Sequence, residues 1–130
     1  CHEVPARLDF VLAELQRRPL GTLQTPEVDA ALLDAAIGRV HSARYLDFLC
    51  GAWAEWVAMD PGNAERDALP SVWPLPNRHG FRNDVLPTNF AARLGLFSFD
   101  SGSPLTAGTW AAARGGAACA ASLRSRAAPA

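Results

Sequence analysis

The sequence predicts a helix-rich part of an α/β domain. Two expected helices, residues 5–17 and 43–59, carry apolar residues at helical spacing along one face. Over residues 97–99 Phe alternates with Ser, which is the period-two pattern of a half-buried strand. A third expected helix, residues 104–123, is built almost entirely of small residues, which suits close packing against a large neighbour. Together these features indicate an α/β domain of which this chain holds mainly helices.

Composition sets the broad class of protein. The chain has 130 residues, of which 49% are hydrophobic and 19% charged, as expected for one folded domain rather than a disordered segment. The net charge of −1 provides no basic field for nucleic acid or an anionic membrane, so neither partner is expected. No apolar run approaches the ~20 residues of a membrane span. Cys1, Cys50 and Cys119 are odd in number and widely spaced, which favours a reducing, cytoplasmic compartment.

The first expected helix, residues 5–17, has one apolar face. Four residues at i, i+3, i+4 and i+7 form it: Leu8, Val11, Leu12 and Leu15. Pro19 ends the helix. Arg7 lies in the first turn, where a cation opposes the helix dipole. This position favours an external carboxylate partner, and a solvated guanidinium is the alternative.

Two further helices are expected before residue 60. A short one follows the Thr-Pro cap signal at residues 25–26 and is predicted to end at Gly38. The strongest helical pattern covers residues 43–59, with Ser42 as N-cap and an Asp-Pro-Gly stop directly afterwards. Its apolar stripe consists of Tyr45, Leu49, Trp53 and Trp56. Such a stripe is more typical of a core than of a binding surface.

Residues 63–96 are expected to form a long loop. Prolines and glycines interrupt it, namely Pro70, Pro74, Pro76, Gly80, Pro87 and Gly95. Loops of this length in compact domains are usually functional or partly disordered. Its aromatic residues, Trp73, Phe81 and Phe90, are expected to anchor it. His79 lies here without a partner motif, which is typical of a solvated histidine.

The turn that contains Asp100 is the candidate site for chemistry. Asp100 follows the expected strand, and Ser103 with Pro104 should cap and begin the next helix. A carboxylate at a strand tip, before a helix, is where α/β proteins place ligand-contacting groups. The alternative is an Asp that only closes the turn. No P-loop, GxGxxG, HExxH or GxSxG motif is present, and the spacing of the three histidines indicates no metal site.

Four stretches of the chain agree in order and spacing with a known family. They are HEVPARLDFVLAEL (residues 2–15), VHSARYLDFL (40–49), LPSVWPLPNRHG (69–80) and FSFDSGSPLTAGTWAAA (97–113). These stretches resemble the histone deacetylase superfamily, and most closely its bacterial acetylpolyamine aminohydrolase branch. The resemblance covers nearly the whole chain.

The resemblance implies the N-terminal part of an arginase–deacetylase fold, a three-layer αβα arrangement around a parallel sheet. Family members hydrolyse acyl-amide bonds with one zinc ion, while histidines act as general base and acid. In the family, the zinc ligands and catalytic histidines follow the segment that ends here, so this chain alone is expected neither to bind zinc nor to hydrolyse amides. The full-length enzyme is expected to deacetylate polyamines or similar small acylated amines.

Two residues match functional positions of the family. Asp100 corresponds to the aspartate at the pocket rim that accepts hydrogen bonds from substrate amides or amines. Arg7 corresponds to the arginine that lines an internal channel for the acetate product, which a guanidinium suits. The spacing of Pro104 from Asp100 favours the aminohydrolase branch. In that branch the loop at residues 63–96 contributes to dimerisation, so a homodimer is also expected.

The ends of the chain suggest a partial domain. Cys1 stands where a Met would begin a gene product, and the Ala-rich tail at residues 124–130 closes no element. Residues 1–130 are therefore expected to be a deacetylase domain truncated at both ends. Without the rest of its sheet, such a chain should leave the face of Leu8, Leu12 and Leu15 without a partner. The alternative is a non-catalytic helical interaction module that uses its aromatic loop to bind a partner.

Overall fold

The computed structural model describes residue 4 and residues 6–73 and 85–127, with side chains up to Leu123. Within this part of the chain it contains five α-helices and one 3-10 helix, and it contains no β-strand. They are α1 (Ala6–Arg17), α2 (Ala30–Val40), α3 (Ala43–Met59), η1 (Pro61–Glu65), α4 (Phe90–Leu96) and α5 (Thr109–Ala127). The expectation of a mostly helical chain is confirmed, and the sheet of an α/β domain is not found among the described residues.

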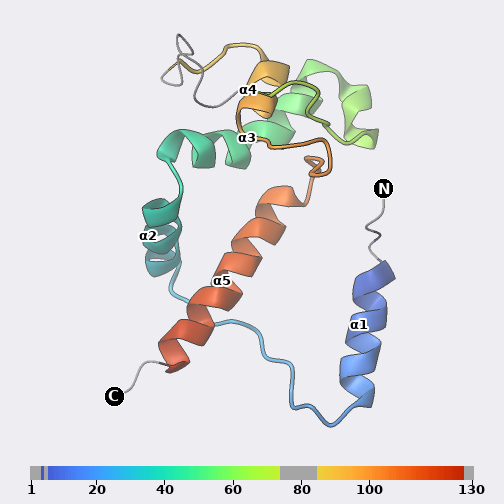
Figure 1. Cartoon of the computed structure of the whole chain (residues 1–130), viewed down its shortest axis with the longest axis vertical. Helices are drawn as coiled ribbons and strands as arrows, with labels where there is room; N and C mark the ends of the chain where they lie inside the picture. The colour runs from blue at the N-terminus through green and yellow to red at the C-terminus, as the bar shows by residue number, and fades with distance from the viewer. Residues whose placement is uncertain (1–3, 5, 74–84, 128–130) are drawn as a thin grey trace.

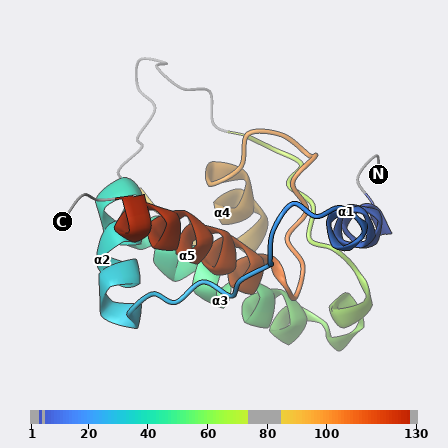
Figure 2. The same cartoon turned by 90° about the horizontal axis from the view of Figure 1, so that it is seen from below.

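The helices form two packed groups and one separate helix. Helix α5 crosses the middle of the molecule, with α2 packed against it, and α3 contacts both η1 and α4 (Figure 1). Helix α1 lies apart from the other helices in both views (Figures 1 and 2). An extended segment, residues 18–29, leads from α1 past α5 to α2. Segments far apart in the chain thereby lie side by side at α5.

The hydrophobic core lies between α3, α4 and the two segments that flank α4. Its buried residues are Phe48, Ala52, Ala68, Phe90, Leu94 and Leu105. The Trp56 ring stacks on Phe90 with 5.6 Å between ring centroids, and its Nε1 donates a hydrogen bond to the Arg66 carbonyl (3.0 Å). Because Trp53 and Trp56 pack against this cluster, the interpretation of the α3 stripe as core is confirmed.

The strand expected at residues 97–99 is not formed. Helix α4 extends through Leu96, and the Phe97 N–H donates to the Arg93 carbonyl at the C-cap. The Ser98 hydroxyl donates to the Leu94 carbonyl (2.7 Å), which closes the helix end further. Phe97 packs beside the core whereas Phe99 is fully exposed. The alternation of Phe and Ser therefore comes from a helix end and not from a strand.

The last helix begins later than expected. Leu105 and Ala68 exchange two backbone hydrogen bonds of 2.9 Å, which hold Leu105 in an extended bridge. The Thr109 Oγ1 then accepts the Thr106 N–H (2.8 Å), and α5 starts at Thr109. The predicted start at Ser103 and Pro104 is wrong because pairing with the distant Ala68 takes precedence over the local cap signal.

Two other boundaries differ from the sequence prediction. Helix α2 begins after Asp29, whose Oδ1 accepts the Ala31 and Leu32 N–H groups, and it continues past Gly38 to Val40. The expected loop at residues 63–96 contains α4, which Asn89 caps by accepting the Ala92 N–H. Several residues singled out in this loop lie outside the described part: Pro74, Pro76, His79, Gly80 and Phe81. Helices α1 and α3 are confirmed. Ser42 is at the N-cap position of α3, but its side chain makes no capping hydrogen bond.

Candidate functional site

Asp100 lies in an exposed turn between α4 and α5. Its Oδ1 accepts a hydrogen bond from the Gly102 N–H (2.8 Å), which fixes the direction of the carboxylate. Its side chain faces solvent, and the neighbouring Phe99 ring is fully exposed. An exposed carboxylate beside an exposed aromatic ring suits a cationic or amine-bearing ligand, through charge attraction and cation–π contact. The turn-closing role considered from the sequence is thus confirmed, and it leaves the carboxylate accessible.

Asp60 forms the same local structure elsewhere in the chain. Its Oδ1 accepts the Gly62 N–H at the same distance, 2.8 Å, where it caps η1. The two Asp-x-Gly turns show that this geometry is by itself a structural device. Asp100 differs from Asp60 in two ways: it lies in the stretch of residues 97–113 that carries the family resemblance, and it follows the fully exposed Phe99.

Arg7 lies in the first turn of α1. Its backbone N–H donates to the Val4 carbonyl (3.0 Å), and its side chain is exposed. The described residues therefore do not enclose Arg7 in a channel, and its assignment to a product channel stays a prediction.

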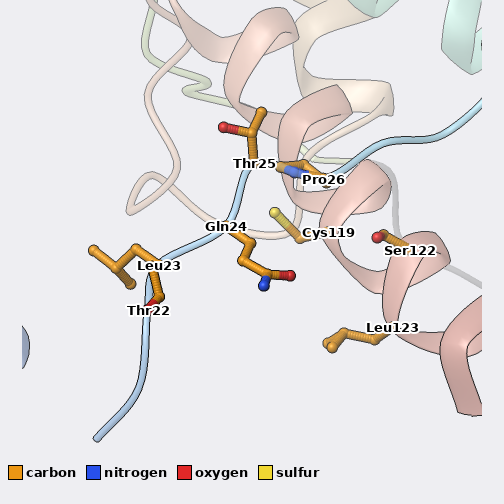
Figure 3. Close-up of a pocket in the computed structure, with 8 residues that line it drawn as sticks. All are labelled: Thr22, Leu23, Gln24, Thr25, Pro26, Cys119, Ser122 and Leu123. Carbon is orange, nitrogen blue, oxygen red and sulfur yellow. The ribbon is translucent and has the colours of Figure 1, made fainter. Parts of the chain in front are cut away.

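A cavity of about 330 Å³ lies where residues 22–26 cross the second half of α5 (Figure 3). The residues that line it carry no charge: Thr22, Leu23, Gln24, Thr25, Pro26, Cys119, Ser122 and Leu123. Neither Asp100 nor Arg7 lines this cavity. The sequence could not indicate it, because its two walls are separated by more than half of the chain.

A second cavity, of about 270 Å³, lies between α3 and α4. Four charged residues line it, namely Arg44, Asp47, Glu55 and Arg93. The other lining residues are Phe48, Gly51 and Leu86. Arg93 forms an ion pair with Glu55 across the two helices. This ion pair joins the two helices across the cavity.

No metal site is formed by the part of the chain that the structure describes. Within residues 4, 6–73 and 85–127, no group of three or more His, Cys, Asp or Glu side chains could hold a metal ion. His41 is the C-cap of α2, where its N–H donates to the Ile37 carbonyl (3.0 Å), and its ring packs against Tyr45. His41 therefore has a structural role at the C-terminal end of α2. These residues do not fit a zinc centre, and His2 and His79 lie outside the described part.

No helix in the described part of the chain is both long and apolar enough to cross a bilayer.

Comparison with known proteins identifies relatives of the chain. No family model matches it. Over 112 residues, the chain is 39% identical to Acetylpolyamine amidohydrolase 2 and 38% identical to Acetylpolyamine amidohydrolase 1, both from Pseudomonas aeruginosa. Each match covers 86% of this chain and 30% of the relative.

Both matches are to amidohydrolases. The chain is similar to part of a bacterial amidohydrolase, and it spans about 30% of the length of the curated relatives it matches. More particularly, both relatives are acetylpolyamine amidohydrolases, so the resemblance to that branch of the deacetylase superfamily is confirmed.

Proposed function

We propose that this chain forms the N-terminal part of a zinc-dependent amidohydrolase that removes acetyl groups from acetylated polyamines or similar small acylated amines. The observation that carries the proposal is the identity of 39% over 86% of the chain to an acetylpolyamine amidohydrolase. In this proposal, the rest of a three-layer αβα domain supplies the parallel sheet, the zinc ligands and the catalytic histidines. The described residues bring no such ligand set together.

Asp100 is proposed to bind the amine or amide nitrogen of the substrate at the pocket rim. The hydrogen bond from Gly102 supports this role, because it orients the carboxylate without consuming its charge. The exposed Phe99 ring beside it offers an apolar surface for the methylene chain of a polyamine. Arg7 is proposed to guide the acetate product once further residues enclose it.

Cytoplasmic location and a homodimer belong to the same proposal. The odd number of widely spaced cysteines supports a reducing compartment. The homodimer would use residues 63–96. Deleting only residues 74–84 of this segment from the longer enzyme leaves the core residues Ala68, Phe90 and Leu94 in place. The deletion should convert the dimer to a monomer in light scattering, and an unchanged dimer would contradict this role.

A hybrid enzyme tests the proposed activity. In it, this chain replaces the corresponding segment of Acetylpolyamine amidohydrolase 2. We expect the hybrid to release acetate from an N-acetylated diamine, to lose turnover after chelation and dialysis, and to regain it with added zinc. The 130-residue chain alone should show neither turnover nor stoichiometric zinc binding.

A folded hybrid without turnover, or turnover that survives zinc removal, would overturn the proposal. Zinc-dependent turnover by the isolated chain would do the same. The alternative function, a non-catalytic interaction module, is favoured by the exposed apolar residues of α1, Leu8, Phe10, Val11 and Leu12. It would gain support from a folded but inactive hybrid.

A further inference from the structure

Helix α1 presents an apolar face that no described residue covers. None of its residues is buried, and the exposed fractions of Leu8, Val11 and Leu12 are 64%, 47% and 45%. These residues share one face with Leu15 because they are three or four positions apart. Leu20 and Leu23, just beyond α1, are exposed as well. Exposed apolar side chains thus occur from Leu8 in α1 to Leu23 in the segment that follows it.

This helix requires a partner to be stable. A helix of 12 residues is marginal in water, and most helical stability in proteins comes from packing of an apolar face. Glu14 pairs with Arg17 at the end of α1 and with Arg18 directly after it. The leucine face itself contains no charged residue.

A second exposed surface indicates how large the partner is. The outward side of α5 between Thr109 and Leu123 is uncharged, and a Cβ added at Gly115 or Gly116 would meet no atom within 4 Å. Exposed helix faces normally carry charged or polar side chains. A symmetric dimer whose interface is α1 alone would cover only one of these surfaces, whereas a longer polypeptide can cover both.

We infer that the leucine face of α1 is a docking surface for the section of an amidohydrolase polypeptide that this chain does not span. The inference rests on the proposed function, and its physical basis is the length comparison: the relatives contain more than twice as much chain outside the matched part as within it, since the match covers 30% of each. That length is sufficient to cover both exposed surfaces. The contact it forms with α1 is apolar and contributes directly to the stability of the longer protein.

The experiment compares leucine substitutions in two contexts, the isolated chain and the hybrid with Acetylpolyamine amidohydrolase 2. Leu8→Gln and Leu12→Gln place an amide on the leucine face. Ala13→Gln is the matched control, because Ala13 is also exposed but lies on the opposite side of α1. Thermal unfolding is measured by circular dichroism, and the mass of the isolated chain is measured by light scattering.

We expect both leucine variants to lower the Tm of the hybrid by roughly 5 °C or more, because each removes a buried apolar contact. The same variants should leave the unfolding of the isolated chain nearly unchanged, and Ala13→Gln should be silent in both contexts. Equal Tm values for the leucine variants and the control in the hybrid would overturn the inference. So would a hybrid that fails to unfold cooperatively while its parent does.

A second copy of this chain is the competing occupant. A concentration-dependent dimer of the isolated chain that Leu8→Gln and Leu12→Gln dissociate would assign the face to self-association and overturn the inference. The measurement is independent of the proposed activity. If the leucine variants lower the Tm of a hybrid that has no turnover, the docking surface is supported and the proposed activity is overturned. If the hybrid is active but its Tm does not respond to the leucine variants, the activity is supported and the docking surface is overturned.

Discussion

Arg93 of α4 and Glu55 of α3 form an ion pair that joins the two helices beside the aromatic core. The Arg93 side chain is only 19% exposed, and that of Glu55 is 41% exposed. Arg93 Nε is buried and has no hydrogen-bond partner within the described part of the chain. Glu55 therefore balances the charge of a guanidinium group that already lacks one of its hydrogen bonds.

Removing Glu55 should destabilise the chain. Glu55→Ala leaves the mostly buried Arg93 guanidinium without its carboxylate, and we expect a loss of about 1–2 kcal/mol in the free energy of unfolding. Asp34→Ala is the control, because it removes the carboxylate partner of Arg114 in a more exposed ion pair between α2 and α5. Urea unfolding followed by tryptophan fluorescence measures both. Equal losses for the two variants would contradict the importance of Arg93 burial.

Gly95 should not tolerate a side chain. An ideal Cβ there would lie 1.9 Å from the Val72 carbonyl oxygen, so the backbone would have to move. We expect Gly95→Ala to cost about 1–3 kcal/mol, as overpacking of a core does. Gly116→Ala in α5 is the control: its Cβ meets open space, and alanine should stabilise the helix by up to about 1 kcal/mol. Urea unfolding that shows the same sign for both variants would contradict the close approach at Gly95.

The stability of α1 should decrease in acid. Hydrogen bonds from Arg17, and then from Arg18, lower the pKa of Glu14 below its ordinary value. Because this pKa is lowered on folding, the stabilisation is complete above the unfolded pKa and is lost as the pH falls through the lowered folded pKa. The carboxyl signal of Glu14 in an NMR titration should therefore have a midpoint below that of an ordinary glutamate.

Two controls accompany this titration. Glu14→Gln should remove the acid-dependent loss of α1 helicity, and high salt should weaken it, since the pair is exposed. A Glu14 midpoint at the ordinary value would show that the pairing with Arg17 and Arg18 does not persist in solution.

The charge of Asp100 should be needed for amine substrates. In the hybrid enzyme, Asp100→Asn keeps an oxygen that can accept the Gly102 N–H, so the turn is retained while the charge is removed. Loss of a charged hydrogen bond of about 1.5–3 kcal/mol predicts a reduction in kcat/KM of roughly 10- to 100-fold. Asp60→Asn makes the same change in the matching turn at Gly62 and should leave kcat/KM unchanged. Equal kinetics for the two variants would assign Asp100 to turn closure alone.

Helices α1 and α3 could be predicted because their signals are local. The spacing of apolar residues and the stop signals at Pro19 and at the Asp-Pro-Gly sequence after Met59 act within a few residues of the backbone they control. The candidate site was predicted in part. Sequence indicated Asp100 and its turn, whereas the cavity between residues 22–26 and α5 could only be seen in the structure.

The sequence by itself determined the helical character of the chain, the turn that orients Asp100 and the resemblance to acetylpolyamine amidohydrolases. The tertiary structure decided where elements end. Phe97 completes α4 rather than beginning a strand, and Leu105 is held out of α5 by its two hydrogen bonds to Ala68. The physical reason is that these outcomes depend on backbone groups and core contacts of segments distant in the sequence. The free energy of these contacts outweighs local propensity, and the contacts leave no periodic pattern in the sequence.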